Sequence, residues 1–513
     1  MKDKFIESVN AGYTCKGDYI VLGGGVLNGE SVPGVHVKIP LKTLNRHGLI
    51  AGATGTGKTK TLQGLVEALS RKGVPCLLMD IKGDLSGVAA SGEPNPKIDE
   101  RHQKIGMPWL PESFPVEFLT ISNEKGARLR ATVSEFGPVL FSKILELNDT
   151  QGGVVSLVFK YCDDNELPLL DLKDFKKALQ FLTNEGKVEI EKEYGRISSA
   201  STSTIIRKII EIEQQGAEVF FGERSFDPDD LTRIDEKGRG YLNIIRLTDI
   251  QDKPKLFSTF MLSLLAEIYA TFPEEGDVEQ PKLAIFIDEA HLIFNEASNA
   301  LLDQIETIIK LIRSKGVGVF FCTQQPTDVP DSVLAQLGLK IQHSLRAFTA
   351  KDRKTIKSVA ENYPLSDFYK TEDLLTHLGI GEALVTALSE KGVPTPLVHT
   401  LLCAPSSRMD ILSENEINEL ISSSALVKKY NEEIDRDSAY EMLSEKISVT
   451  PGKQTDETSG KKTSKGEKSV IGEAVDSTVG RQVMRTVARE LTRGLLGVLG
   501  VSSTRRRKSS GWF

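Results

Sequence analysis

Short apolar runs alternate with amphipathic helical patterns along much of the 513-residue chain. The apolar run 47–51 leads into a glycine-rich turn, and a helical pattern over 58–71 ends before Gly73. A second apolar run, 74–80, follows directly. Strand, turn, helix and strand in this order form a βα unit, which predicts a parallel sheet covered by helices on both faces. Ligands of such sheets bind at the carboxyl ends of the strands.

The same alternation returns in the second half of the chain. The patterns predict strands at 240–247, 282–288 and 316–323 and helices at 254–272 and 298–314. Three further short apolar runs extend the predicted sheet: 340–345, 383–388 and 396–402. The predicted fold class is therefore α/β, with a parallel-rich sheet.

A helical region interrupts this sheet pattern. Apolar residues at three- and four-residue spacing predict helices at 141–147, 153–161, 172–184 and 202–215. Near the N-terminus, glycine-rich turn signals separate short β-branched runs and predict small hairpins. The expected organisation is a short β-rich segment (1–45), a first core part (46–125), a helical insert (126–235), a second core part (236–447), a disordered linker (448–470), and a basic amphipathic helix with a tail (471–513).

Composition narrows the class of protein. Hydrophobic residues make up 39% of the chain and charged residues 26%, as in ordinary globular proteins. No apolar run approaches the ~18 residues that cross a bilayer, and the first residues lack the apolar stretch of a signal peptide. We therefore expect a cytoplasmic protein without a transmembrane segment. The five cysteines are scattered and form no CxxC pair, so neither a disulfide framework nor a zinc site is expected.

The charge is distributed unevenly. The chain carries a formal net charge of −7, but residues 481–513 hold eight basic residues and one acidic residue, so the remainder carries −14. An acidic body excludes non-specific coating of nucleic acid, because that mode of binding needs a broad basic surface that releases counterions. Any contact with nucleic acid is therefore expected to be local, in a pore or in the tail.

The C-terminal basic helix has three open interpretations. Arginines recur there at four-residue spacing, on a different face from the apolar residues. The helix could serve oligomerisation or contact with a protein, or be simply solvated. It could also bind nucleic acid, or lie on an anionic membrane surface. The sequence does not choose among these roles.

A phosphate-binding loop is predicted between the first strand and the first helix of the core. The pattern GxxxxGK[ST] is matched by Gly52, Ala53, Thr54, Gly55, Thr56, Gly57, Lys58 and Thr59. Glycines let backbone N–H groups surround phosphate oxygens, and the helix N-terminus adds partial positive charge. Lys58 is expected to reach the β- and γ-phosphates and Thr59 to ligate Mg²⁺, with Lys60 completing the nucleotide-binding segment. ATP and Mg²⁺ are the predicted cofactors.

Two acids close the predicted strand 282–288. A nucleotide site needs a carboxylate at a strand's carboxyl end to hold the metal, and Asp288 is placed for this role. Glu289 beside it is a candidate general base for the attacking water. The alternative is a pair of surface acids that merely ends a strand. Together with the phosphate loop, the pair favours hydrolysis over nucleotide binding alone.

Further candidates follow neighbouring strands. Gln324 comes directly after strand 316–323, where its amide could sense the γ-phosphate or cap a turn. Arg313 and Arg346 are each candidates for an arginine finger on a neighbouring subunit's nucleotide, or are solvated or ion-paired residues. Asp80 either positions metal or water or fixes the turn before Gly83. His291 is expected to be a packing residue rather than a ligand.

Five short segments together resemble a known family. They are Asn45-Arg46-His47-Gly48-Leu49-Ile50 before the phosphate loop, Asp80-Ile81-Lys82-Gly83-Asp84-Leu85-Ser86-Gly87, Asp288-Glu289-Ala290-His291, Arg313-Ser314-Lys315-Gly316-Val317-Gly318, and Thr323-Gln324-Gln325-Pro326. The chain resembles the bacterial HerA-like P-loop ATPases of the FtsK–HerA group over about residues 12–445.

The resemblance implies a RecA-like core that assembles as a homo-hexameric ring and hydrolyses ATP between subunits. It also implies movement along double-stranded DNA, as in related members. It assigns nucleotide binding to residues 52–59, metal and base to Asp288 and Glu289, and the polar sensor to Gln324. It assigns the trans-acting finger to Arg313 in preference to Arg346.

Two functional hypotheses follow. In the first, the ring is an ATP-driven DNA translocase or helicase, and basic residues line its pore, with Lys340, Lys351 and Arg353 as candidates. In the second, the ring is an ATP-dependent switch or remodeller that acts on protein or at a membrane surface. Stimulation of ATP turnover by double-stranded DNA separates the two hypotheses.

Overall fold

The structure is a computed structural model that describes residues 1–448 apart from 277, 297–298, 433 and 435–436. The expected linker and basic C-terminal helix therefore lie outside the described residues, except for residue 448. In the part of the chain that is described, no helix is both long and apolar enough to cross a membrane.

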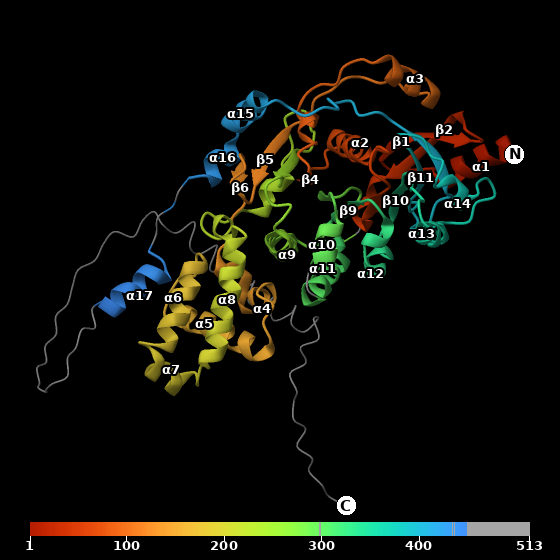
Figure 1. Cartoon of the computed structure of the whole chain (residues 1–513). Helices are drawn as coiled ribbons and strands as arrows, with labels where there is room; N and C mark the ends of the chain where they lie inside the picture. The colour runs from red at the N-terminus through yellow and green to blue at the C-terminus, as the bar shows by residue number, and fades with distance from the viewer. Residues whose placement is uncertain (277, 297–298, 433, 435–436, 449–513) are drawn as a thin grey trace, which may run out of the picture. The chain divides into compact units, whose positions relative to one another are not determined.

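One sheet of twelve strands runs through the described residues (Figure 1). Its strands are β1 (Tyr19–Leu27), β2 (Glu30–Pro40), β3 (Gly48–Ala51), β4 (Cys76–Asp80), β5 (Val116–Thr120), β6 (Ala127–Arg128), β7 (Leu242–Arg246), β8 (Leu283–Ile287), β9 (Val317–Thr323), β10 (Leu339–Gln342), β11 (Glu382–Thr386) and β12 (Val398–Leu402). Their spatial order is β2-β1-β12-β11-β10-β3-β9-β8-β4-β7-β5-β6.

The predicted α/β fold with a parallel-rich sheet is confirmed. From β10 to β6 all neighbouring strands are parallel, whereas the pairs from β2 to β10 are antiparallel. The β-rich N-terminal segment is therefore an extension of the core sheet, because β1 pairs with β12. The strand β5 and the helix that precedes β1 were not predicted.

Helices cover the sheet and form the insert. Those of the sheet and the N-terminus are α1 (Lys2–Gly12), α2 (Lys58–Arg71), α3 (Pro96–Ile105), α9 (Pro254–Thr271), α10 (His291–Glu296), α11 (Asn299–Ile312), α12 (Asp331–Leu334), α13 (Ala350–Glu361) and α14 (Thr371–Leu374). Those of the insert are α4 (Val133–Ile144), α5 (Asp149–Asp164), α6 (Leu172–Thr183), α7 (Lys187–Glu193) and α8 (Ser199–Gln214). The last three are α15 (Glu414–Ser423), α16 (Ala425–Tyr430) and α17 (Ala439–Ser448).

The central strands are buried on both faces. Along β8, Leu283, Ile285 and Ile287 pack in the core shared with α9 and α11. Ala284 and Phe286 point to the opposite face, where they share a core with α2. Burial on both sides explains why these strands have uninterrupted apolar sequences instead of alternating ones.

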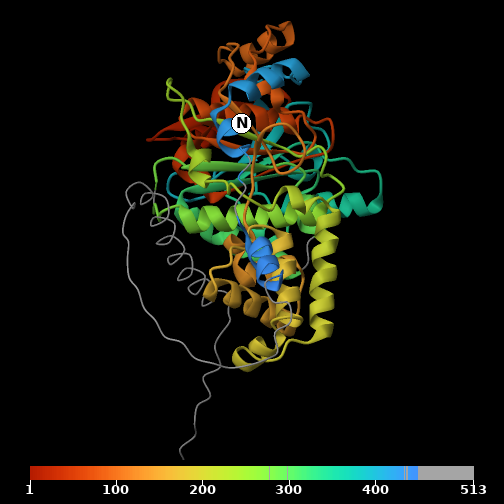
Figure 2. The ribbon, with the colours of Figure 1, turned by 90° about the vertical axis from the view of Figure 1, so that its left-hand side faces the viewer.

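The helical insert gathers beyond one face of the sheet. Figure 2 shows its orange and yellow helices on the far side of the green helices α9 and α11, and α4 contacts both of these. The predicted helices 153–161, 172–184 and 202–215 correspond to α5, α6 and α8. Helix α4 starts earlier than predicted, and its backbone is kinked at Gly137, just before Pro138.

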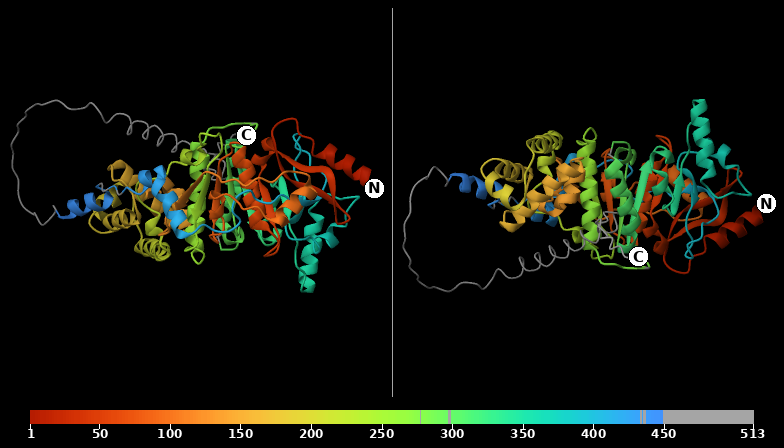
Figure 3. Two further views of the ribbon diagram at one scale, coloured as in Figure 1. Left: turned by 90° about the horizontal axis from the view of Figure 1, so that it is seen from above. Right: turned by 90° about the horizontal axis from the view of Figure 1, so that it is seen from below.

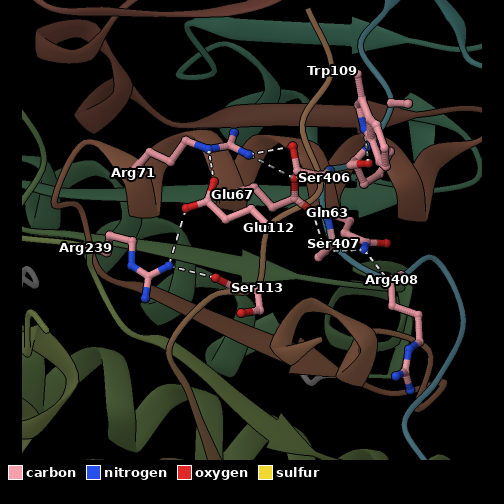
Figure 4. Close-up of polar contacts among 12 residues, drawn as sticks. Gln63, Glu67, Arg71, Trp109, Glu112, Ser113, Arg239, Ser406, Ser407 and Arg408 are labelled. Carbon is pink, nitrogen blue, oxygen red and sulfur yellow. Dashed lines mark hydrogen bonds and ion pairs between the residues drawn. The ribbon is translucent and has the colours of Figure 1, made fainter. Parts of the chain in front are cut away.

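After β12 the chain crosses the end of α2 and returns to the insert. Helices α15 and α16 lie against β5 and β6, and α17 packs on α6. Figure 4 shows how α2 holds the start of this return. The buried Glu67 carboxylate accepts hydrogen bonds from Ser406 N (2.7 Å) and Ser407 N (3.1 Å), and Gln63 donates to the Arg408 carbonyl (2.9 Å). Polar side chains of the P-loop helix thus fix the C-terminal return.

Candidate nucleotide site

The predicted phosphate loop connects β3 to α2 at the carboxyl edge of the sheet. Gly52 and Gly57 have φ angles of 153° and 107°, which side chains other than glycine rarely adopt. A Cβ atom on Gly52 would lie 2.4 Å from the His343 Cβ atom. The loop therefore needs glycine both for its backbone conformation and for its close approach to β10.

Neighbouring strands hold the loop in place. Gly52 N donates to the Thr323 carbonyl at the end of β9 (3.2 Å), and Ala53 N donates to the Ser344 carbonyl after β10 (2.9 Å). The Thr56 carbonyl accepts from Gly381 N (3.0 Å). These three segments fix the phosphate loop, here called the cradle, before a ligand binds. A preformed loop loses less entropy when it binds its ligand.

Lys58 lies at the centre of this cradle and is 8% exposed. Its ammonium donates to the carbonyls of Gly52 (2.7 Å) and Ala53 (3.2 Å). Burial lowers the pKa of Lys58, and the positive charge of Lys82 adds to this effect. Glu289 and Asp288 oppose it, so both acids lie within electrostatic range of Lys58.

Thr59 is half-buried at the start of α2. The side chain of the next residue, Lys60, has partners within the chain. Its ammonium donates to Gln63 Oε1 (3.1 Å) and to the Met409 carbonyl. The Lys60 side chain thus links α2 to the C-terminal return.

Asp288 follows β8, which is separated from β3 by β9. Its carboxyl is 6% exposed, and burial raises its pKa to about 6. The Oδ2 atom is buried and has no hydrogen-bond partner among the described residues. Such an oxygen fits a cation, because a bound metal would restore the interactions lost on burial.

A complete protein cage for a metal is absent from the described residues, which contain no cluster of three or more His, Cys, Asp or Glu side chains suited to one. Mg²⁺ usually takes one or two protein oxygens and fills its other positions with phosphate and water. Asp288 and Thr59 would supply the protein oxygens.

Glu289 is 5% exposed and adopts φ of 47°. One carboxylate oxygen forms an ion pair with Lys82, and the other lies 3.2 Å from His291 Nδ1. His291, expected to be a packing residue rather than a ligand, thus has a polar contact with the Glu289 carboxylate. Each oxygen of the Glu289 carboxylate therefore has a neighbouring side chain that restrains its position.

Asp80 fixes the turn that carries Lys82. Its Oδ1 atom accepts from Gly83 N (2.8 Å) and Asp84 N (3.1 Å), and its Oδ2 atom from Leu85 N (3.2 Å). Burial raises the pKa of Asp80 to about 7. Of the two open interpretations, the structure favours the turn-forming role.

Arg346 contacts its own phosphate loop. The guanidinium donates to the Thr54 carbonyl (3.1 Å), a contact within the same chain. Gln324 is exposed directly after β9, at the same edge of the sheet. These side chains and Lys58 therefore lie at one end of the parallel strands.

Arg313 lies at the opposite end. It begins the 3-10 turn Arg313–Lys315, immediately before β9, and it is exposed. The seven residues of β9 span about 23 Å at 3.3 Å per residue. Arg313 therefore cannot reach the phosphate loop of its own chain, and it can approach such a loop only on another molecule.

The sequence matches the family described as "Helicase HerA-like C-terminal" over residues 26–507. The chain belongs to this family. It is 26% identical over 363 residues to the DNA double-strand break repair helicase HerA of Sulfolobus acidocaldarius, covering 68% of this chain and 64% of that protein. It is 23% identical over 368 residues to the protein of the same name from Saccharolobus solfataricus. That match covers 68% of this chain and 63% of the relative. The match thus spans less than two thirds of these relatives.

Solved structures of another protein share the fold. The plasmid coupling protein TrwB in complex with the ATP analogue ADPNP has a TM-score of 0.50 and 15% identity, covering 78% of this chain and 99% of that one. TrwB in complex with ADP and Mg²⁺ also has a TM-score of 0.50 and 15% identity, and the match covers 79% of this chain and 100% of that one. At this identity the likeness shows the RecA-like P-loop fold of the HerA-like chain and nothing further.

Two residues of the HerA-like site lacked an assigned role in the sequence. Lys82 belongs to the segment 80–87 that carries the resemblance, but nothing in its pattern indicates Glu289 as its partner. His343 lies beneath the loop, where Nε2 is 2.9 Å from Thr61 Oγ1. Burial, assisted by the charge of Lys58, lowers the pKa of His343 to about 4, so it is neutral at physiological pH. An isolated histidine after a short strand gives no sequence signal for this position.

Proposed function

We propose that this HerA-like chain is a Mg²⁺-dependent ATPase whose homo-hexameric ring translocates double-stranded DNA. One observation carries the ATPase proposal. Lys58 of the phosphate loop lies within electrostatic range of Asp288 and Glu289, although β9 separates their strands. Nucleotide hydrolysis needs a phosphate loop with its lysine beside two acids, one that binds the metal and a second one.

Each group has a role in this proposal. The backbone N–H groups of 52–59 and the Lys58 ammonium bind the triphosphate and orient it. Asp288 and Thr59 hold Mg²⁺, which supplies charge neutralisation at the phosphate oxygens when it is bound. Glu289 accepts the proton of the attacking water at a carboxylate oxygen, and Gln324 is placed to sense the γ-phosphate.

The ring is supported by the position of Arg313. Its exposed guanidinium and its own phosphate loop lie at opposite ends of β9, so it can complete a nucleotide site only on another subunit. An arginine supplied in trans stabilises the charge of the transition state. DNA as the substrate is supported by the names of the relatives, which describe helicases of double-strand break repair.

The test compares ATP turnover of the wild type, Glu289→Gln and the control Glu193→Gln, which changes an exposed residue of α7. Each is assayed with and without a blunt DNA duplex. We expect Glu289→Gln to lower kcat by about 100-fold or more while a fluorescent ATP analogue still binds. Glu193→Gln should behave as the wild type, and the duplex should stimulate the wild type.

Three outcomes would contradict parts of the proposal. A wild type without turnover would overturn the ATPase assignment. Full activity of Glu289→Gln would remove this residue from the role of base. Turnover that ignores DNA would favour the alternative, an ATP-dependent switch that acts on protein or at a membrane surface.

A further inference from the structure

Helix α13 presents an exposed basic face. Its four cations Lys351, Arg353, Lys354 and Lys357 are all exposed, and none forms an ion pair within the described part of the chain. The opposite face, formed by Ile356 and Val359, is buried in a small core with Leu345. The helix is therefore fixed to the body by its apolar side, and its cations face solvent.

Two exposed lysines on other helices of this chain form ion pairs within their own helix. Lys104 of α3 and Lys160 of α5 each form an ion pair with an acid one turn away. On α13 the acid Asp352 is used differently, because its carboxylate accepts from Phe348 N (2.9 Å) and Thr349 N (2.8 Å). Asp352 therefore does not neutralise its neighbours, and four exposed cations lie within seven residues of α13 in a chain of net charge −7.

The basic face is connected to the candidate nucleotide site. Arg346, which donates to the Thr54 carbonyl, is followed two residues later by Phe348, whose side chain is 82% exposed. Phe348 and Thr349 then form the N-terminal cap of α13. In both views of Figure 3 the teal helix α13 projects from the sheet.

We propose that the basic face of α13 binds the phosphate backbone of nucleic acid, with Phe348 at its edge. The inference rests on the proposed motor function, because it names the surface that holds the polymer. Residues 351–357 rise by about 9 Å along the helix, which matches about two to three phosphates of one strand at 3.4 Å per phosphate.

A membrane surface fits this face less well. An amphipathic helix binds a bilayer by inserting its apolar side between the lipids. The apolar side of α13 is already buried in the protein, so only its charges are available. Lys340, one of the predicted pore residues, does not belong to the face, because it lies within β10 between β3 and β11 and burial lowers its pKa.

The test measures the affinity of the full chain for a 30-base-pair duplex at several salt concentrations, without nucleotide. In the first variant, Lys351, Arg353, Lys354 and Lys357 are all replaced by Gln. In the second, the three lysines are replaced by Arg, which keeps the charge. A matched control removes four exposed cations of the insert, by changing Lys173, Lys187, Lys192 and Arg207 to Gln.

We expect the Gln variant to weaken binding at least tenfold and to reduce the slope of log K against log salt by about 2, one unit for each phosphate that the helix no longer neutralises. The Arg variant and the insert control should bind as the wild type does, which would exclude misfolding and a change in net charge as causes.

Unchanged affinity and slope in the Gln variant would overturn the proposal. So would a wild type that does not bind the duplex, or a Gln variant that loses only its binding to vesicles of phosphatidylserine and phosphatidylcholine. Because the assay contains no ATP, these failures are distinct from a failure of the ATPase assignment.

Discussion

The ammonium of Lys82 forms an ion pair with the carboxylate of Glu289, and this contact joins the turns that follow β4 and β8. Because these strands are neighbours, a basic side chain from one turn reaches the candidate base on the other. The Asp80 carboxylate fixes the turn of Lys82 by accepting three backbone N–H groups. The orientation of Glu289 therefore depends on residues remote from it in the sequence.

Replacing Lys82 by Met should lower kcat by about tenfold or more while changing the KM for ATP by less. Without Lys82, the buried Glu289 carboxylate loses its ion pair, and its orientation is no longer fixed from that side. Lys82→Arg keeps the charge and should retain most of the activity. Steady-state kinetics of both variants check this expectation, and a Met variant with a larger effect on KM than on kcat would contradict it.

Mixing variants should distinguish the two arginines. Lys58→Ala and Arg313→Ala subunits are each expected to be inactive alone, and mixing them should restore turnover, since Arg313 of one subunit then meets Lys58 of the other. A mixture of Lys58→Ala and Arg346→Ala should stay inactive, because Arg346 contacts the phosphate loop of its own chain. ATP turnover across mixing ratios provides the measurement. Recovery in the second mixture would place Arg346 in trans.

Replacing Glu67 by Ala should lower the free energy of unfolding by about 3 kcal/mol, because it leaves Ser406 N and Ser407 N without their buried acceptor. Glu67→Gln keeps the packing and should cost less. The control Glu93→Ala changes an exposed residue and should stay within about 0.5 kcal/mol of the wild type. Urea unfolding followed by circular dichroism provides the values. Equal stability of Glu67→Ala and the wild type would show that these hydrogen bonds contribute nothing.

Acid should destabilise the chain partly through His343. Its pKa is about 4 in the folded chain, whereas an unfolded histidine titrates near 6.5, so the unfolded state binds the proton first as the pH falls. The contribution of His343 to stability is present above pH 6.5 and is lost progressively toward pH 4.

Between pH 7.5 and 5, the wild type should therefore lose about 2 kcal/mol more stability than His343→Gln. Raised carboxyl pKa values elsewhere act in the opposite direction, but they cancel in this comparison. His377→Gln, at an exposed position, serves as the control and should behave as the wild type. Parallel pH profiles of the wild type and His343→Gln would contradict the assignment.

The sequence by itself determined the βα units and the phosphate loop. Local patterns suffice for these features, because uninterrupted apolar runs mark strands that are buried on both faces, and glycine spacing sets the loop conformation. The motif segments also indicated the family correctly. In contrast, the antiparallel pairing of β1 with β12 has no local signal, because partner choice depends on contacts between distant segments.

Only the tertiary structure decided which side chains meet. It placed Asp288 and Glu289 near Lys58 and paired Glu289 with Lys82. It also put Arg346 at the carboxyl ends of the parallel strands and Arg313 at their amino ends. These relationships follow from strand order, which no single segment encodes. The chemistry of each residue can be inferred from its type and spacing, whereas its partner is fixed only when the strands take their places beside one another.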